Sequence, residues 1–119
     1  MSDHVKRPTA VTTDLATGPS AEDARGRMFA SLSGETLEWA MARYTPHPVA
    51  AMQQPVKLSS FWQRQWNASV IWCKQSVNPP VAHQRRAADT LKARWHELDT
   101  GHYPMLTEPK ALAELCMIG

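Results

Sequence analysis

His102 is the residue whose neighbours in the sequence most favour a chemical role. It stands between Gly101 and Tyr103-Pro104, shortly after Trp95–Leu98, a short segment with a weak period-two pattern. Glycine permits a sharp turn and proline fixes the backbone, so together they hold the histidine on a rigid loop. An imidazole presented in this way at the end of a strand can take up or release a proton.

The other chemistry-bearing residues form no recognisable site. A serine nucleophile on a strand-to-helix turn needs the form Gly-x-Ser-x-Gly, which the sequence lacks. The five histidines are dispersed, and neither HExxH nor a Cys/His cluster occurs, so we expect no metal. GxGxxG and GxxxxGK(S/T) are also missing from the sequence, so we expect no nucleotide cofactor.

The sequence predicts that His102 is positioned by a short α/β unit. Ser69–Cys73 is a nearly continuous apolar run, typical of a strand buried on both faces of a parallel sheet. A helical pattern follows over residues 80–94, and a second strand is indicated at 95–98. The order strand, helix, strand predicts a parallel βαβ unit with a right-handed crossover. A last helix is expected over 107–118, with Thr107 as its cap.

The preceding part of the chain is expected to be irregular and then helical. Residues 1–20 are polar and contain turn-forming residues, which predicts an irregular lead-in, with a short strand over 10–13 as the alternative. Ser20 and Asp23 have the spacing of a helix start. Two short helices over 24–32 and 35–44 should follow.

Two groups of large apolar side chains are assigned to the core. The first is a helical stripe made of Met28, Phe29, Leu37, Trp39 and Met41. The second is formed by Phe61, Trp62 and Trp66. Aromatic residues among Gln and Arg can also stack on nucleic acid, but this stretch holds too few basic residues to favour that role.

The stretch Gly101-His102-Tyr103-Pro104-Met105-Leu106, with Glu108-Pro109 and residues 112–115, resembles the C-terminal end of an α/β-hydrolase. Ser69–Cys73 is similar to the penultimate strand of that family, residues 79–86 to its crossover helix, and residues 44–49 more loosely to the end of a cap segment. The resemblance implies a partial α/β-hydrolase fold. It would comprise a helical cap-like segment over 21–67 and the C-terminal part of the core over 68–119.

The same resemblance implies that His102 is the catalytic histidine, the general base of a serine hydrolase. In that family the acid follows the penultimate strand, but the loop of residues 74–78 contains no carboxylate. Ser76 stands about where the acid is expected, with Asn78 nearby. Asp99 and Asp14 are the carboxylates left as alternatives. The nucleophile elbow and the oxyanion loop have no counterpart in the sequence.

The implied function is that of an esterase-like serine hydrolase acting on a small ester or amide. Large α/β domains take about 200–250 residues, so we expect these 119 residues to act as a C-terminal part that is inactive alone. A small-molecule substrate would then bind only when the missing half is supplied. The alternative is a non-catalytic, degenerate homologue that serves as an interaction or self-association module through an open sheet edge.

Composition limits the other classes. The formal net charge of +2 is too small to indicate a nucleic-acid partner, and no apolar run is long enough to span a bilayer. A hydrophobic content of 43% is sufficient for a core. Cys73 and Cys116 lack a CxxC spacing and are expected to be reduced thiols. With no signal peptide visible after Met1, the expected location is the cytoplasm.

Overall fold

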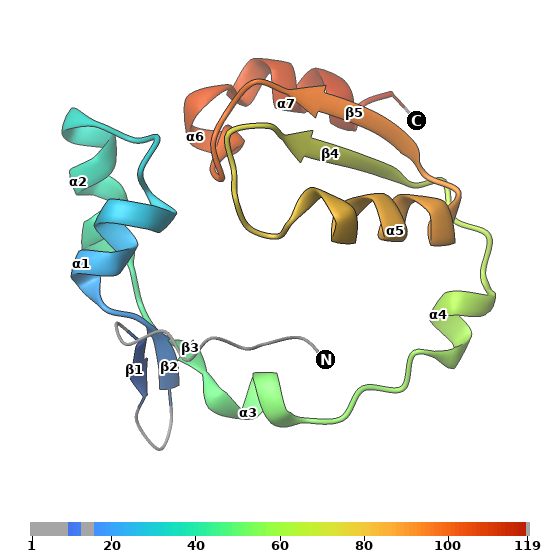
Figure 1. The fold of residues 1–119 in the computed structure, drawn as a ribbon, viewed down its shortest axis with the longest axis horizontal. Helices are drawn as coiled ribbons and strands as arrows, with labels where there is room; N and C mark the ends of the chain where they lie inside the picture. The colour runs from blue at the N-terminus through green and yellow to red at the C-terminus, as the bar shows by residue number, and fades with distance from the viewer. Residues whose placement is uncertain (1–9, 13–15, 119) are drawn as a thin grey trace. The chain divides into compact units, whose positions relative to one another are not determined.

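The computed structural model describes residues 10–12 and 16–118, and over these residues the chain is a mixed α/β protein (Figure 1). It divides into two units, Met1–Val56 and Lys57–Gly119. The first holds a small antiparallel sheet with short helices, and the second holds a parallel strand pair with its helices. The mixed α/β class is therefore confirmed, while the domain boundaries expected after residues 20 and 67 stay predictions.

The sheet of the N-terminal unit has the strand order β1-β2-β3, with all pairs antiparallel. Its strands are β1 (Ala10–Thr12), β2 (Ala16–Pro19) and β3 (His47–Pro48). The expectation of an irregular lead-in over 1–20 is wrong for these strands, and β1 agrees with the alternative of a strand over 10–13. Strand β1 pairs with Thr17, Gly18 and Pro19 and strand β3 with Ala16 and Thr17, so β2 is extended although Gly18 and Pro19 are turn-forming residues.

Three helical segments complete the packed part of this unit, namely α1 (Ala21–Asp23), the π-helical η1 (Ala24–Met28) and α2 (Gly34–Arg43). Ser20 caps α1 as predicted, because its Oγ accepts a hydrogen bond of 3.1 Å from the Asp23 N–H. The wider π turn ends with the Phe29 N–H donating to the Ala24 carbonyl at 2.9 Å. The helix expected over 24–32 is therefore shorter and wider than an α-helix.

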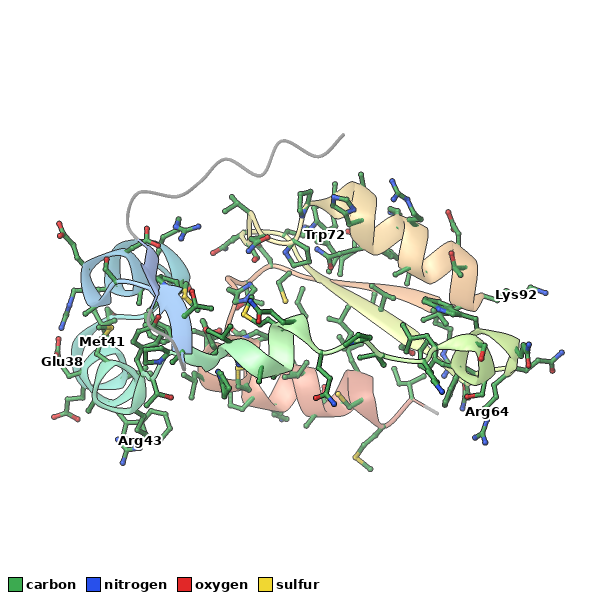
Figure 2. All side chains as sticks on the ribbon, turned by 90° about the horizontal axis from the view of Figure 1, so that it is seen from below. Glu38, Met41, Arg43, Arg64, Trp72 and Lys92 are labelled. Atoms are coloured by element: carbon green, nitrogen blue, oxygen red, sulfur yellow. The ribbon has the colours of Figure 1, made fainter. Side chains whose placement is uncertain are left out.

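The core of the N-terminal unit is built from small and aromatic side chains. Its buried members are Ala24, Phe29, Leu32 and Ala40. Phe29 packs edge-on against Tyr44, with ring centroids 6.3 Å apart. Trp39 was assigned to the core, but it is 51% exposed, and its ring lies 4.3 Å from the guanidinium carbon of Arg43. Glu38 and Arg43 project outward from the same helix (Figure 2).

Two short helices, α3 (Val49–Gln53) and α4 (Ser59–Gln63), follow along the chain. Helix α3 begins directly after Pro48. The aromatic group after it is not buried as predicted, since Trp62 and Trp66 are 52% and 40% exposed. Phe61 instead stacks with both tryptophans, at centroid distances of 4.9 Å each. The apolar surface of Phe61 is thus covered locally by the two tryptophan rings. The pattern of apolar residues in the sequence does not distinguish this local packing from burial in the core.

The C-terminal unit contains the predicted βαβ arrangement. Strands β4 (Ser69–Cys73) and β5 (Arg94–Leu98) pair in parallel, and helix α5 (Val81–Leu91) connects them. Lys92 ends α5 in a left-handed conformation with φ of 51°. The guanidinium carbon of Arg85 lies 3.6 Å from the centroid of the Trp95 ring. The helix thus contacts the sheet through a cation–π interaction as well as through buried Ala88.

The chain ends in two helices, α6 (Pro104–Thr107) and α7 (Pro109–Cys116), rather than in the single helix expected over 107–118. Glu108 has φ of −138° and ψ of 52°, which is not helical, and Pro109 restrains the residue before it. Thr107 is the last residue of α6, so the prediction that it caps the final helix is wrong. Among the described helices none is both long and apolar enough to cross a membrane.

Replacing Ser20 with alanine should lower the free energy of unfolding of the N-terminal unit by about 1 kcal/mol, because an N-cap hydrogen bond is lost. The amide NMR signals of Ala24 and Phe29, followed through a urea titration, measure this loss. Ser33→Ala is the matched control, since Ser33 precedes α2 without a side-chain capping bond. Equal losses in the two variants would contradict the capping role of Ser20.

Candidate functional site

The candidate site lies where the loops that follow β4 and β5 run side by side. Parallel strands place their carboxyl ends at the same edge of a sheet. The pairing continues past the strands, because the Lys74 N–H donates to the Leu98 carbonyl at 2.9 Å and the Gln75 N–H to the Thr100 carbonyl at 3.0 Å. These two backbone bonds hold the loops together just before Ser76 and His102.

Ser76 and His102 are in direct contact across the two loops. Ser76 Oγ lies 2.9 Å from His102 Nδ1, and it donates to the Asn78 carbonyl at 3.0 Å. A hydroxyl has a single proton, and a carbonyl can only accept. Both bonds therefore form together only when His102 Nδ1 carries the proton and donates it to Ser76 Oγ. In the neutral ring this leaves Nε2 as the nitrogen with the lone pair.

Hydrogen bonds of two threonine side chains hold the loop that carries His102 in place. Thr100 is only 4% exposed, and its hydroxyl lies 2.7 Å from that of Thr107. Thr107 Oγ1 donates to the Tyr103 carbonyl at 3.3 Å, so its oxygen accepts the Thr100 proton. Gly101 and Pro104 are buried, whereas His102 between them is exposed. This arrangement agrees with the prediction that the loop presents the histidine.

The carboxylates considered as partners of His102 do not occupy the Nδ1 position. Asp99 Oδ1 accepts a hydrogen bond of 3.2 Å from Gln75 Nε2 and thereby joins the two loops at another point. Asp14 lies outside the described residues. Ser76, noted from its place in the chain, is the residue in contact with Nδ1. A hydroxyl can orient the ring as a carboxylate does, but it supplies no charge to stabilise the imidazolium.

The contribution of Asn78 was missed by the sequence analysis. Asn78 was noted only as lying near the expected position of the acid, whereas in the structure its backbone carbonyl accepts a hydrogen bond from the Ser76 hydroxyl. Every residue has such a carbonyl, so only the turn geometry could have indicated it. That turn is set by the Ser76 N–H, which donates to the Cys73 carbonyl at 2.9 Å.

Cys73, the last residue of β4, is the thiol nearest in sequence to this loop. It is a free thiol with intermediate burial, and that burial raises its pKa. A cysteine nucleophile requires the opposite shift, toward the thiolate. Cys73 is therefore poorly suited to replace the missing serine. Ser31 and Ser33 belong to the other unit, where both precede α2.

No cluster of three or more His, Cys, Asp or Glu side chains capable of holding a metal ion occurs among residues 10–12 and 16–118. The site is a single imidazole, oriented through Nδ1 and carried by an exposed residue. Such a group can act as a general base for a nucleophile that is brought to it.

The chain matches no protein-family model, no curated protein and no solved structure. The resemblance to α/β-hydrolases therefore stays a prediction from the sequence.

The tautomer of His102 tests the hydrogen-bond chain directly. Nitrogen-15 NMR of the neutral ring should report the proton on Nδ1, because Ser76 accepts it. Ser76→Ala removes that acceptor and should transfer population to the Nε2–H form. Ser59→Ala, in the same unit, is the control and should leave the ring unchanged. A dominant Nε2–H form in the parent chain would contradict the assignment.

The two thiols should differ in reactivity. At pH 8, iodoacetamide should alkylate exposed Cys116 at least about threefold faster than Cys73, because the raised pKa of Cys73 reduces its thiolate fraction. Peptide mass spectrometry at several reaction times measures both rates, and unfolding in urea should bring them together. Faster alkylation of Cys73 in the folded chain would overturn the argument against it as a nucleophile.

Proposed function

We propose that this chain is the histidine-bearing part of an esterase-like serine hydrolase with an α/β-hydrolase fold. The observation that carries the proposal is the hydrogen bond of 2.9 Å between His102 Nδ1 and Ser76 Oγ. It orients the ring from the loop after the neighbouring parallel strand, at the place where this class of enzyme supplies its acid. The sequence around His102 and the parallel βαβ unit support the same assignment.

In the proposed reaction a serine hydroxyl attacks the carbonyl carbon of a small ester or amide. His102 Nε2 takes the serine proton as the bond forms and then gives it to the leaving alcohol or amine. Water hydrolyses the acyl-enzyme by the same two proton transfers. Ser76 keeps the proton on Nδ1 throughout, so that Nε2 faces the nucleophile. General base catalysis of this kind is typically worth about 10²–10⁴ in rate.

The serine must come from outside the sequence described, because these 119 residues contain no Gly-x-Ser-x-Gly. Residues 21–67 would then correspond to a cap-like segment and residues 68–119 to the end of the core. The substrate would be recognised chiefly by the part that brings the nucleophile. An oriented histidine without a nucleophile cannot form an acyl-enzyme.

The chain alone should therefore hydrolyse p-nitrophenyl acetate without a burst phase, and no faster than free imidazole at the same concentration. Stopped-flow absorbance of released p-nitrophenol measures both quantities. A burst that is stoichiometric with protein and is lost in His102→Ala would contradict this expectation, since it would show that the chain already contains a nucleophile.

The coding sequence tests the family assignment. Translating about 130 codons upstream of Met1, roughly the length that a full domain would still need, should reveal an in-frame Gly-x-Ser-x-Gly. In the protein that carries it, His102→Ala should lower kcat by at least about 10²-fold. Ser76→Asp should raise kcat because a carboxylate stabilises the imidazolium, whereas Val77→Asp, at a side chain 81% exposed, should not. An upstream sequence without this motif would remove the proposal.

A second candidate function is a non-catalytic interaction module. It is favoured by one observation, namely that β4 and β5 pair only with each other among the described residues. The outer edge of each strand then presents backbone groups that can pair with a strand of another chain. Sedimentation velocity over about a hundredfold range of concentration tests self-association, and a stable monomer throughout would count against it.

A further inference from the structure

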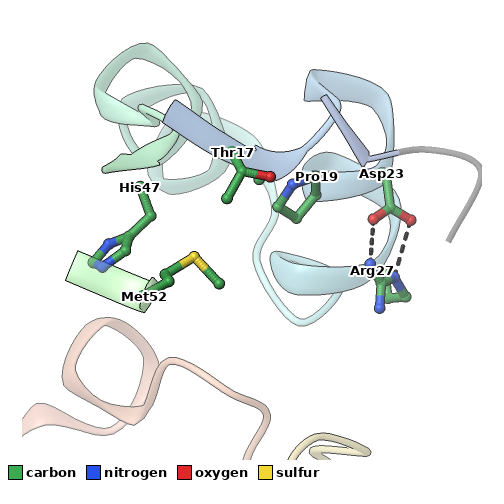
Figure 3. A pocket seen from close by; sticks show the side chains of 7 residues that line it. Thr17, Pro19, Asp23, Arg27, His47 and Met52 are labelled. Atoms are coloured by element: carbon green, nitrogen blue, oxygen red, sulfur yellow. Dashed lines mark hydrogen bonds and ion pairs between the residues drawn. The ribbon is translucent and has the colours of Figure 1, made fainter. Parts of the chain in front are cut away.

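The N-terminal unit contains a pocket of about 470 Å³ that plays no part in the proposed hydrolase chemistry. Its lining residues are Thr17, Gly18, Pro19, Asp23, Arg27, His47 and Met52. Figure 3 shows His47 and Met52 on one side, the Asp23–Arg27 pair on the other, and Thr17 and Pro19 between them. The volume is within the usual range for small-molecule sites, about 300–1,000 Å³. The pocket therefore has the size and the mixed lining of a ligand site.

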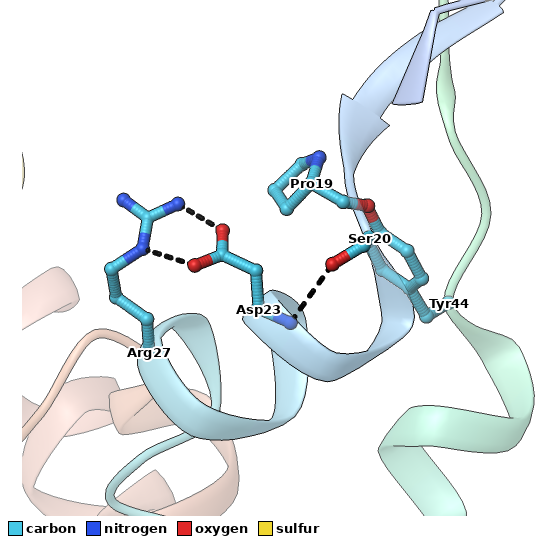
Figure 4. Close-up of polar contacts among 5 residues, drawn as sticks. All are labelled: Pro19, Ser20, Asp23, Arg27 and Tyr44. Carbon is cyan, nitrogen blue, oxygen red and sulfur yellow. Dashed lines mark hydrogen bonds and ion pairs between the residues drawn. The ribbon is translucent and has the colours of Figure 1, made fainter. Parts of the chain in front are cut away.

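The arginine in this pocket has one edge engaged and one edge available. Arg27 Nε donates to Asp23 Oδ1 at 2.9 Å, and its Nη2 donates to Asp23 Oδ2 (Figure 4). Within the described part of the chain, Nη1 makes no hydrogen bond. A guanidinium has five N–H donors in a planar fork, so its Nη1–Nη2 edge can still receive a carboxylate with two parallel bonds. Asp23 thereby holds the guanidinium group of Arg27 in position to bind the carboxylate of a ligand.

The apolar wall of the pocket is also fixed in position. Tyr44 donates its phenolic proton to the Pro19 carbonyl at 2.6 Å. Burial, together with the nearby charge of Asp23, raises the pKa of Tyr44 and keeps this donor protonated. A Cβ on Gly18 would lie 2.9 Å from Tyr44 Oη, so only glycine leaves room for this contact. The hydrogen bond from Tyr44 thus holds in place strand β2, which contributes Pro19 to the wall.

We propose that this pocket binds a small carboxylic acid with an apolar body. The carboxylate lies on the Nη1–Nη2 edge of Arg27, and the body lies against Pro19 and Met52. His47, across the pocket, is placed to contact the far end of the ligand. The inference does not depend on the hydrolase assignment, because every residue that it uses belongs to the N-terminal unit.

Two matched probes test the proposal on the full chain, namely 2-naphthoate and its neutral analogue 2-naphthylmethanol. Two-dimensional amide NMR titrations should show shifts centred on Gly18, Arg27 and His47 for both probes. The carboxylate should bind about tenfold more tightly, because it alone makes charge-assisted hydrogen bonds. Absence of shifts at these residues with millimolar probe, or equal affinity for the two probes, would overturn the proposal.

Variants assign the carboxylate contact and the apolar contact separately. Arg27→Gln should reduce the affinity for 2-naphthoate to that for the alcohol, whereas Arg25→Gln should change neither. Arg25 is the matched control because it lies two residues before Arg27 and, like Arg27, makes two hydrogen bonds to a carboxylate, in its case that of Glu38. An affinity for 2-naphthoate that is unchanged in folded Arg27→Gln would contradict the assigned contact.

Met52→Glu should weaken both probes at least about tenfold, since it replaces apolar wall with negative charge. Met52 is 64% exposed, so this substitution does not depend on refolding of a core. Met117→Glu, at a residue 85% exposed in the other unit, is its control and should leave both affinities unchanged. Equal affinities in Met52→Glu and the parent chain would exclude the pocket as the binding site.

Discussion

The parallel hydrogen bonding between β4 and β5 is the interaction on which the candidate site depends. Ser76 and His102 are 26 residues apart in the chain, and the strand register brings the loops that carry them to the same edge of the sheet. Two backbone bonds beyond the strands, from Lys74 and Gln75, carry the pairing into the loops. Without these two backbone bonds each loop would be free to move independently. Forming the Ser76–His102 contact would then cost the conformational entropy of ordering both loops.

The contact between Ser76 and His102 supplies part of what a carboxylate supplies in a hydrolytic triad. It fixes the tautomer of His102 and the direction of Nε2. Because the Ser76 hydroxyl already donates its hydrogen bond to the Asn78 carbonyl, it can only accept one from Nδ1. It does not supply the negative charge that stabilises an imidazolium. A histidine arranged in this way is oriented but weakly supported as a base. In the proposed hydrolase, Ser76 would therefore orient His102 without the electrostatic assistance of a carboxylate.

Much of the C-terminal unit could be predicted from local sequence. The apolar run Ser69–Cys73 gave β4 with its observed bounds, and the residues around His102 gave a loop that exposes it. The bond to Ser76 could not be derived in the same way, because no residue pattern encodes which loop atoms face each other across parallel strands. The carbonyl of Asn78 is likewise invisible in a sequence.

In the N-terminal unit tertiary contacts override local signals. Gly18-Pro19 indicates a break in regular structure, yet the pairing with β1 and the bond from Tyr44 keep this part of β2 extended. Trp39 follows the apolar stripe of its helix but stacks on Arg43 at the surface. The pocket was not foreseen, because its lining comes from segments that only the folded chain brings together.

Amide hydrogen exchange at Gln75 tests the central claim most directly. If the loops are joined as described, the Gln75 N–H, which donates to the Thr100 carbonyl at 3.0 Å, should exchange as slowly as the central amides of β4. The account predicts protection at Gln75 even though its side chain is exposed. Exchange at the rate of an unstructured peptide would contradict it, because Ser76 and His102 would then no longer be held in register.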